Sequence, residues 1–240
     1  METYREFLDR INSFEKKELI FGSEYFKGNP SILQKVDQNN RFRDFYGDTV
    51  VFSLEDQVKD KLEKYVNFLY CSAPECFCER LASGTFHMTL HDLSSSTILG
   101  DIAEELFENE FKVMKKIAEI QKYNITKIKM RSHYIFNMVN TSLVLGLYPV
   151  DAQEYHKLIK LYSVFDSVKK LNYPLTPHIT LAYYSSNGFD LKAARVLEDA
   201  VRWLNNHEPE IEINISRLFY QKFKTMNHYI NVAELSTPRL

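Results

Sequence analysis

Apolar residues recur along the chain with two alternating periods, and the order of these periods repeats. An apolar strand at residues 49–54 precedes a stretch in which apolar residues return every three or four positions, as in an amphipathic helix. A strand at residues 86–90, a second helical stripe and strands at residues 125–130 and 133–139 complete this unit. The two predicted stripes are Val58, Leu62, Tyr65, Val66 and Leu69, then Ile102, Leu106, Phe107, Phe111, Met114 and Ile117.

The second half of the chain passes through the same order of elements. Asp151 and Glu154 predict a capping box at the start of its first helix, and Asp190 predicts the cap of its second helix. The strands of this unit are predicted at residues 143–148, 178–181, 211–220 and 228–232. The helical stripes are Tyr155, Leu158, Ile159, Tyr162 and Phe165, then Leu191, Ala194, Leu197, Val201 and Leu204.

This repetition predicts an α+β fold with a duplicated βαβαβ unit. We expect two lobes related by a pseudo-twofold axis, with two mostly antiparallel sheets facing a central cleft. Residues 1–48 are interpreted as an N-terminal helical and extended extension, and residues 49–240 as the bilobal domain. The lobes would cover about 49–140 and 141–240, with exchange of strands between them left open. The alternative is an ordinary α+β protein, whose elements alternate in this way without duplication.

A short polar motif occupies the same place in both units. Side chains two residues apart in a strand share one face, so His87 and Thr89 point the same way, and so do His178 and Thr180. The residues between and beside them are apolar and suit a core behind the strand. A single His-x-Thr is more often a structural histidine than a site, but two copies in matching positions predict four polar groups around one cleft.

These residue types suit the cleavage of a phosphodiester. In-line displacement needs a base on one side of phosphorus and an acid on the other, and imidazole, with an ordinary pKa of about 6.5, serves either role. Threonine hydroxyls can donate to the non-bridging oxygens and stabilise the charge that develops there. This chemistry requires no metal ion and no cofactor, and we expect neither. Cys71, Cys76 and Cys78 do not have zinc-site spacing and are interpreted as free thiols.

The two motifs in a duplicated unit resemble those of the 2H phosphoesterase superfamily, which includes the RNA 2′,3′-cyclic phosphodiesterase and 2′-5′ RNA ligase family. The stretch FYGDTVVF at residues 45–52, followed by HMTL, is similar to an uncharacterised bacterial branch of that superfamily. The resemblance covers about residues 49–235. It implies a cyclic phosphodiesterase, a phosphoric diester hydrolase acting on a 2′,3′-cyclic phosphate or a related small or 2′-5′-linked nucleotide.

The resemblance also implies a role for each motif residue. His87 and His178 would be the acid and base, and Thr89 and Thr180 would bind the phosphate. By analogy His178 activates water and His87 protonates the leaving oxygen, although the near-symmetry also permits the reverse. Some RNA-processing relatives carry a basic residue soon after the second motif. This chain has Ala-Tyr-Tyr at residues 182–184 instead, which favours stacking of a base on tyrosine over recognition of long RNA.

Three further residues are candidate substrate contacts. His91 continues the alternation of the first motif and would face the cleft, although a solvent-exposed histidine at a strand end is an equal alternative. Tyr184 stands four residues after His178 and is expected to stack on a base or to pack between the lobes. Tyr220 lies where a late strand of this fold approaches the cleft, and a core position is its alternative.

Charge limits the class of partner. The chain has 30 basic and 32 acidic residues and a net charge of −2, without the basic excess typical of proteins that hold a long nucleic-acid backbone. We therefore expect a small nucleotide or an RNA 3′ end, no long nucleic acid and no membrane. The charged N-terminal segment does not resemble a signal peptide, so a cytoplasmic monomer is expected.

Two other hypotheses compete with a phosphodiesterase. The first is a non-catalytic nucleotide- or RNA-binding module that retains the pocket, which would bind nucleotides without turnover. The second is a structural protein with coincidental motifs, in which the two histidines would lie far apart. The sequence does not distinguish a 2′- from a 3′-phosphate product, or RNA processing from removal of a signalling nucleotide.

Overall fold

The structure is a computed structural model and describes residues 2–14, 25–208 and 210–236. Its helices are α1 (Tyr4–Asn12), α2 (Asp56–Ser72), α3 (Leu99–Lys122), α4 (Ala152–Asp166) and α5 (Leu191–His207), with short 3₁₀ turns η1 (Pro30–Gln34), η2 (Pro74–Cys76) and η3 (Ser83–Thr85). Its strands are β1 (Tyr25–Phe26), β2 (Tyr46–Ser53), β3 (His87–Ser96), β4 (Ile128–Met138), β5 (Ser142–Pro149), β6 (His178–Tyr183), β7 (Phe189–Asp190), β8 (Glu212–Ile215), β9 (Arg217–Thr225) and β10 (His228–Glu234).

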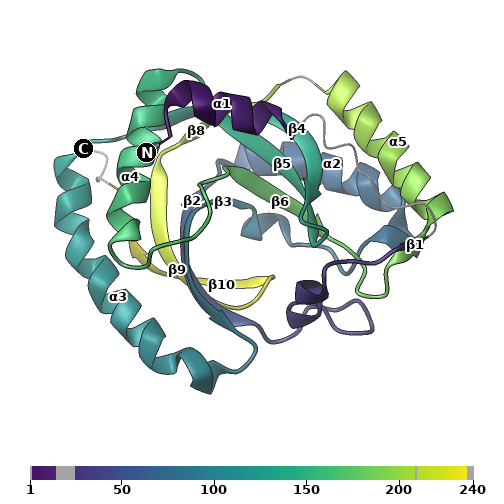
Figure 1. Cartoon of the computed structure of the whole chain (residues 1–240), viewed down its shortest axis with the longest axis horizontal. Coiled ribbons are helices and arrows are strands. Elements are labelled where there is room, and N and C mark those ends of the chain that lie inside the picture. Colours follow the sequence, from purple (N-terminus) through teal and green to yellow (C-terminus); the bar gives the residue numbers. More distant parts are fainter. Residues whose placement is uncertain (1, 15–24, 209, 237–240) are drawn as a thin grey trace.

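Two four-stranded antiparallel sheets form the centre of the molecule. The first sheet has the order β10-β9-β2-β3 and the second has the order β8-β4-β5-β6, so the positions correspond one to one. The strands that begin with the two histidines, β3 and β6, lie alongside one another where the sheets meet (Figure 1). The predicted α+β fold with two antiparallel sheets about a cleft is confirmed.

The strands of each sheet come from both halves of the sequence. β4 belongs to the second sheet, whereas β9 and β10 pair with β2 in the first. The sheets therefore do not coincide with residues 49–140 and 141–240, because strands are exchanged. The single strand predicted at residues 211–220 is wrong, since the chain leaves the second sheet after β8 and enters the first at β9, with Ser216 between them. The strands predicted at 125–130 and 133–139 form one irregular strand, β4.

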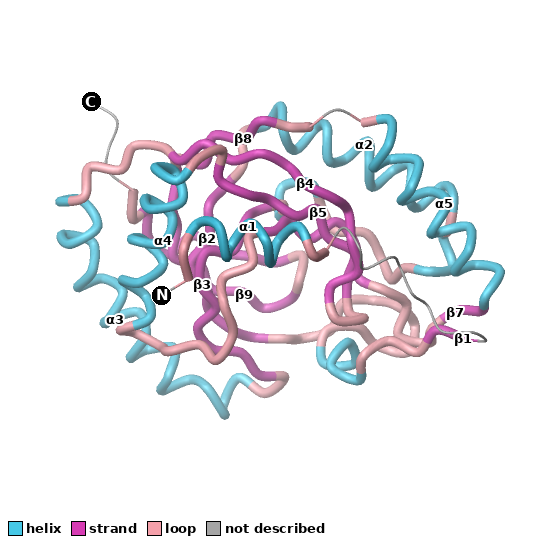
Figure 2. Tube along the Cα trace, turned by 45° about the horizontal axis from the view of Figure 1, so that its top comes forward, coloured by secondary structure: helices cyan, strands magenta, loops and turns pink. Residues whose placement is uncertain are grey.

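Four helices cover the sheets in two pairs. α2 contacts α5 on one side of the molecule, and α3 contacts α4 on the other (Figures 1 and 2). The buried stripe predicted for α2 is confirmed. For α3 the stripe is wrong at Phe107 and Phe111, which are 72% and 57% exposed. This helix packs along a narrower line instead, and its buried residues are Ile102, Leu106, Asn109, Val113 and Ile120.

The predicted helix caps are observed with one difference. The side chain of Asp151 accepts from the backbone N–H of Glu154 at 2.9 Å, and that of Asp190 accepts from Ala193 N–H at 2.9 Å. Glu154 does not complete a capping box. Its carboxylate accepts instead from the backbone N–H of Lys129 and from the ammonium of Lys157, so it ties α4 to β4.

Two described parts of the segment before residue 46 pack against elements of the second lobe. α1 packs on α4 through Phe7 and Ile11, which bury against Tyr155. After η1 the chain forms a small loop that is tied to the second lobe, because the amide oxygen of Asn40 accepts from the backbone N–H of Ser186 at 2.9 Å. Among the helices of the described residues, none combines the length and apolar character needed to cross a bilayer.

Candidate active site

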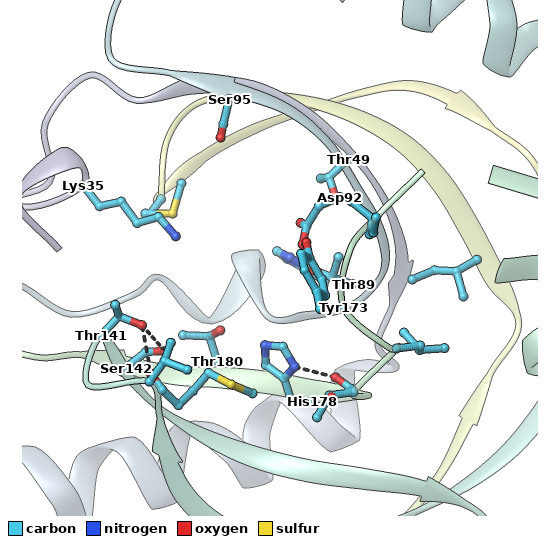
Figure 3. Close-up of a pocket in the computed structure, with 18 of the residues that line it drawn as sticks. Lys35, Thr49, Thr89, Asp92, Ser95, Thr141, Ser142, Tyr173, His178 and Thr180 are labelled. Atoms are coloured by element: carbon cyan, nitrogen blue, oxygen red, sulfur yellow. Dashed lines mark hydrogen bonds between the residues drawn. The ribbon is translucent and has the colours of Figure 1, made fainter. Parts of the chain in front are cut away.

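Both His-x-Thr motifs line one cleft between the sheets. Its volume is about 920 Å³, which is within the range of sites for small ligands. His87 and Thr89 reach it from β3, and His178 and Thr180 reach it from β6. Figure 3 shows Thr89, His178 and Thr180 around the same space. The structure therefore brings the four predicted residues together and excludes the hypothesis that the histidines are far apart.

The two imidazoles are oriented by equivalent hydrogen bonds. Nδ1 of His87 lies 2.7 Å from the carbonyl oxygen of Thr85, and Nδ1 of His178 lies 2.7 Å from that of Thr176. A carbonyl oxygen only accepts, so each Nδ1 carries the proton and donates. Nε2 of each ring is thereby left to accept or donate a proton within the cleft. This is the arrangement that a general base or acid requires.

The two threonine hydroxyls are available to a ligand. Neither Thr89 nor Thr180 donates its hydroxyl hydrogen to another group in the described part of the chain, although both line the cleft. Thr89 pairs with Val51 and Thr180 with Val144, both central strand residues, so rigid backbone holds these hydroxyls. Two hydroxyl donors beside two imidazoles suit an anionic group with several oxygens, such as a phosphate.

A β-bulge follows each motif at the same place. Val51 pairs with Thr89 and Val50 with His91, which leaves Leu90 as the extra residue of β3. Similarly, Val144 pairs with Thr180 and Leu143 with Ala182, which leaves Leu181 as the extra residue of β6. A bulge interrupts the strict alternation of faces beyond it. The residues that face the cleft after each bulge are therefore one position later than alternation predicts.

The bulges overturn two of the predicted substrate contacts. His91 does not face the cleft: it is buried behind β3, its ring lies 5.0 Å from that of Tyr162, and its Nε2 lies 3.2 Å from Oδ1 of Asp166. Tyr184 is fully buried and packs on Phe77 and other core rings. The positions that line the cleft in their place are Asp92 and Tyr183.

The third predicted contact, Tyr220, is also wrong. Its side chain is buried on the far side of β9, and its hydroxyl donates to Oδ2 of Asp48 at 2.8 Å. Oδ1 of Asp48 accepts from the backbone N–H of Ser94 at 2.8 Å, beside a second register shift between β2 and β3. Tyr220 thus belongs to a buried polar network that holds β3 in shape, and it does not line the cleft.

Asp92 and Lys35 are among the charged side chains that line the cleft, and neither was predicted. Asp92 accepts a hydrogen bond from the hydroxyl of Tyr173 at 2.9 Å, and Figure 3 shows the two side by side. Lys35 enters the cleft from the other side, with its Nζ 5.2 Å from the ring centre of Tyr183 and 5.3 Å from that of Phe45. No carboxylate of the described residues pairs with Lys35. The cleft therefore has an acidic and a basic side.

Aromatic rings line the basic side of the cleft. They are Phe45, Tyr183, Phe223 and Tyr229. Phe45 stacks with Phe223 at 5.9 Å between ring centres, and the ring of Tyr229 meets that of His87 edge-on at 5.1 Å. The hydroxyl of Tyr183 donates to Sδ of Met226 at 3.2 Å. A planar base placed here would meet rings together with an ammonium group.

Burial lowers the pKa of both histidines. Removal from water disfavours the charged form of His87, and the nearby charge of His178 lowers its pKa further. For His178 burial again has the largest effect on the pKa, and Lys35 also lowers it. Asp92 acts in the opposite direction and raises the pKa of both rings. The carbonyl oxygens of Thr85 and Thr176, through their hydrogen bonds to Nδ1, raise the pKa of their rings more strongly, so these bonds and Asp92 together favour a protonated imidazole.

Metal ligands do not gather in the described residues: no three His, Cys, Asp or Glu side chains lie close enough together to hold an ion.

Solved structures share this fold at low sequence identity. A conserved protein of unknown function from Agrobacterium tumefaciens is 15% identical, with a TM-score of 0.65 over 88% of this chain and 94% of its own. A protein described as a phosphoesterase is 13% identical, with a TM-score of 0.52 over 81% and 99% of the two chains. Escherichia coli LigT in complex with ATP is 13% identical, with a TM-score of 0.51 over 82% and 99%.

At these identities the likeness shows the fold, and it confirms the fold that the resemblance of the two motifs implied. No protein-family model and no curated protein sequence matches the chain significantly.

Proposed function

We propose that this protein is a phosphoesterase of the 2H type that hydrolyses a phosphodiester bond of a small nucleotide or of an RNA end. One observation carries the proposal. Two imidazoles from equivalent strands lie in one cleft with two unengaged threonine hydroxyls, and matching carbonyl groups fix Nδ1 of each ring. The fold shared with a protein described as a phosphoesterase and with LigT supports it.

Hydrolysis follows from these groups by in-line displacement. The hydroxyls of Thr89 and Thr180 bind the non-bridging oxygens and stabilise their growing charge. Nε2 of one histidine takes a proton from water as the water oxygen bonds to phosphorus. Nε2 of the other histidine, protonated beforehand, gives its proton to the leaving oxygen as the second P–O bond breaks. The products are an alcohol and a phosphate monoester, and proton exchange with water restores both rings.

The surroundings of the histidines favour a nucleotide as substrate. The aromatic rings beside Lys35 provide a stacking surface for a base. The ammonium group of Lys35 can interact with a phosphate or with the face of the bound base. A cleft of about 920 Å³ suits one or two nucleotides. We propose a 2′,3′-cyclic phosphate or a 2′-5′-linked nucleotide as the substrate class.

Turnover in the presence of a chelator tests this function. We expect 2′,3′-cyclic nucleotides or 2′-5′-linked dinucleotides to be cleaved equally with and without EDTA, because no step above uses a metal ion. A bell-shaped dependence of kcat/KM on pH should accompany the activity. Full activity in both the His87→Ala and the His178→Ala variants would refute the proposal. Nucleotide binding without turnover across the whole panel would instead support a binding module.

A further inference from the structure

A second cavity continues from the first beside His87. Its volume is about 740 Å³, and it lies between the ends of β2, β9 and β10 and the turn η3. Three residues line both cavities: Thr85, His87 and Tyr229. The imidazole of His87 therefore stands at the junction, with the phosphate-binding cleft on one side and the second cavity on the other.

The lining of this second cavity is polar, and its charged side chains include the carboxylates of Glu55 and Asp56, with Lys59 paired to Asp56 at 3.7 Å. These carboxylates disfavour a second phosphate there. Amide and hydroxyl side chains predominate, among them Ser53, Asn214, Gln221 and Asn231. Arg217 also lines it, but its guanidinium forms two hydrogen bonds with the carboxylate of Glu234, at 3.1 and 3.0 Å. The cavity therefore offers donors and acceptors in fixed directions without an unpaired guanidinium. A nucleoside, which carries hydroxyls and a base edge but no charge, matches it better than a second phosphate.

One acceptor in this cavity has no donor. The side-chain Nε2 of Gln221 donates to Oδ1 of Asn231 at 2.7 Å, but its Oε1 is buried and accepts no hydrogen bond from the residues that the structure describes. A buried acceptor without a donor costs free energy, and rotation of the Gln221 side chain, which lines the cavity, would let Oε1 accept from a bound hydroxyl or amine. Gln221 thus points to a ligand that carries a hydrogen-bond donor.

The equivalent place in the second sheet is closed. Ser53 pairs with His87 and lines the open cavity, whereas its counterpart Gly146 pairs with His178. The space over Gly146 is filled, since a Cβ there would meet the ring of Phe136 at 3.0 Å, and Phe136 in turn stacks on Phe14 beyond the end of α1. Among the described residues, Phe136, which itself lines the first cavity, therefore occupies the place beside His178 that corresponds to the open space beside Ser53.

We propose that the second cavity is a subsite for the nucleoside that carries the leaving oxygen, so that the substrate is a diester with a nucleoside on each side of phosphorus. The inference rests on the proposed function and makes His87 the acid that protonates the leaving oxygen. His178 then activates water on the opposite side. The nucleoside that keeps the phosphate occupies the aromatic side of the first cavity.

An obstructing substitution tests the subsite. Gly84 lines the second cavity and not the first, and a Cβ there would meet no atom within 4 Å, so Gly84→Trp can fill the cavity without backbone strain. Gly100, at the start of α3, also has open space and lines neither cavity. Gly100→Trp is the matched control for an added indole. Near-UV circular dichroism would establish that both variants fold.

Binding is measured by calorimetry in a His178→Ala background, in which cleavage of the dinucleotide is expected to be about a thousandfold slower. The probes are adenylyl-(2′→5′)-adenosine, which would occupy both subsites, and adenosine 2′-monophosphate, which would occupy only the first. We expect Gly84→Trp to weaken binding of the dinucleotide about tenfold and to change binding of the monophosphate less than about twofold. Gly100→Trp should change neither. Equal weakening of both probes by Gly84→Trp, or weakening of neither, would overturn the subsite.

A second variant guards against misfolding of the first. Gln221→Leu keeps a side chain of similar size and removes the amide, so it should weaken the dinucleotide several-fold and spare the monophosphate. An unchanged affinity for the dinucleotide would contradict the assignment. Turnover by the unmodified protein is scored separately. Selective binding of the dinucleotide with no turnover would refute the proposed function while leaving the subsite in place.

Discussion

The strands β3 and β6 carry the same motif in the same geometry, but their surroundings differ. Each histidine donates from Nδ1 to the carbonyl two residues before it, and each strand bulges at a leucine, Leu90 or Leu181. Beyond the bulge, Asp92 faces the cleft on one strand and Tyr183 on the other. Beside His87 the cleft continues into a second cavity, whereas beside His178 it is lined by Arg10 of α1 and by Phe136.

This difference separates two requirements of the proposed reaction. The negative charge of a phosphodiester is shared by two equivalent non-bridging oxygens. The duplicated threonines, Thr89 and Thr180, match this symmetric charge. The direction of the reaction is not symmetric, because water attacks from one side and an alcohol leaves from the other. The parts of the site that differ between the lobes are therefore the parts that can assign a direction.

The largest expected effect is the loss of either imidazole. His87→Ala and His178→Ala should each lower kcat on a dinucleotide about a thousandfold, because each removes a proton transfer. A substrate with a p-nitrophenolate leaving group distinguishes the two roles, since this group leaves without a proton. On that substrate His87→Ala should lose only about tenfold, whereas His178→Ala should keep its full loss. Steady-state kinetics with both substrates is the measurement, and the opposite pattern would exchange the two roles.

A somewhat smaller effect is expected from the hydroxyls. Thr89→Val and Thr180→Val keep the shape of the side chain and suit a strand, but remove the donor to a phosphate oxygen. Each should lower kcat about a hundredfold, and to a similar extent, because these hydroxyls belong to the matching part of the two lobes. Thr→Ser variants at the same positions should restore most of the activity. A large loss at only one of the two positions would break the equivalence of the motifs.

The parts of the site that follow regular strand geometry could be predicted from the sequence. Alternation placed His87 with Thr89 and His178 with Thr180, and repetition placed the pairs opposite one another. The predicted stripe of α2 is confirmed in full, and that of α5 is confirmed except at Leu191, which is only partly buried. The stripe predicted for α3 is wrong at Phe107 and Phe111, which remain exposed. Hydrophobicity alone does not reveal how much of a helix a sheet covers.

The parts that depend on irregular backbone could not be predicted. Leu90 and Leu181 are ordinary strand residues, and no local signal marks them as bulged, so His91 and Tyr184 were assigned to the cleft in place of Asp92 and Tyr183. Lys35 lies in an extension without apolar periodicity, and tertiary contacts such as that between Asn40 and Ser186 position it. The chain passes from one sheet to the other at Ser216, between β8 and β9. The sequence does not indicate this change, because the two strands form one continuous run of strand-like residues.

Substitution of the charged side chains Asp92 and Lys35 is expected to shift the pH dependence of activity. Asp92 raises the pKa of both histidines, so Asp92→Asn should move both limbs of the kcat/KM profile to lower pH. Lys35 lowers the pKa of His178, whereas the main influences on the pKa of His87 are burial, Thr85, His178 and Asp92, so Lys35→Met should move chiefly the His178 limb, and to higher pH. Profiles of the two variants on one substrate provide the test. Parallel movement of both limbs in Lys35→Met would contradict the asymmetry.

The smallest effect on activity is expected from substitution of the residues that hold the segments containing the Thr85 and Thr176 carbonyl groups. On one side, Arg10 of α1 donates to the hydroxyl of Thr176 at 3.0 Å and to the carbonyl of Leu175 at 2.9 Å. On the other, Asn227 accepts from the backbone N–H of Ala82 at 2.8 Å and donates to the carbonyl of Arg80 at 2.9 Å. Each residue therefore holds, through different hydrogen bonds, the segment that precedes one of the two His-x-Thr strands.

Arg10→Met and Asn227→Ala should each reduce kcat by only about threefold to tenfold, because the imidazoles remain and only their orientation loosens. The bond to the Thr176 carbonyl raises the pKa of His178, and the bond to the Thr85 carbonyl raises that of His87. Arg10→Met should therefore lower the pKa of His178 alone, and Asn227→Ala that of His87 alone. Titration of the two imidazoles by NMR reads both directly. A shift of both rings in either variant would show that the lobes are coupled, and that the two halves of the site do not hold their histidines independently.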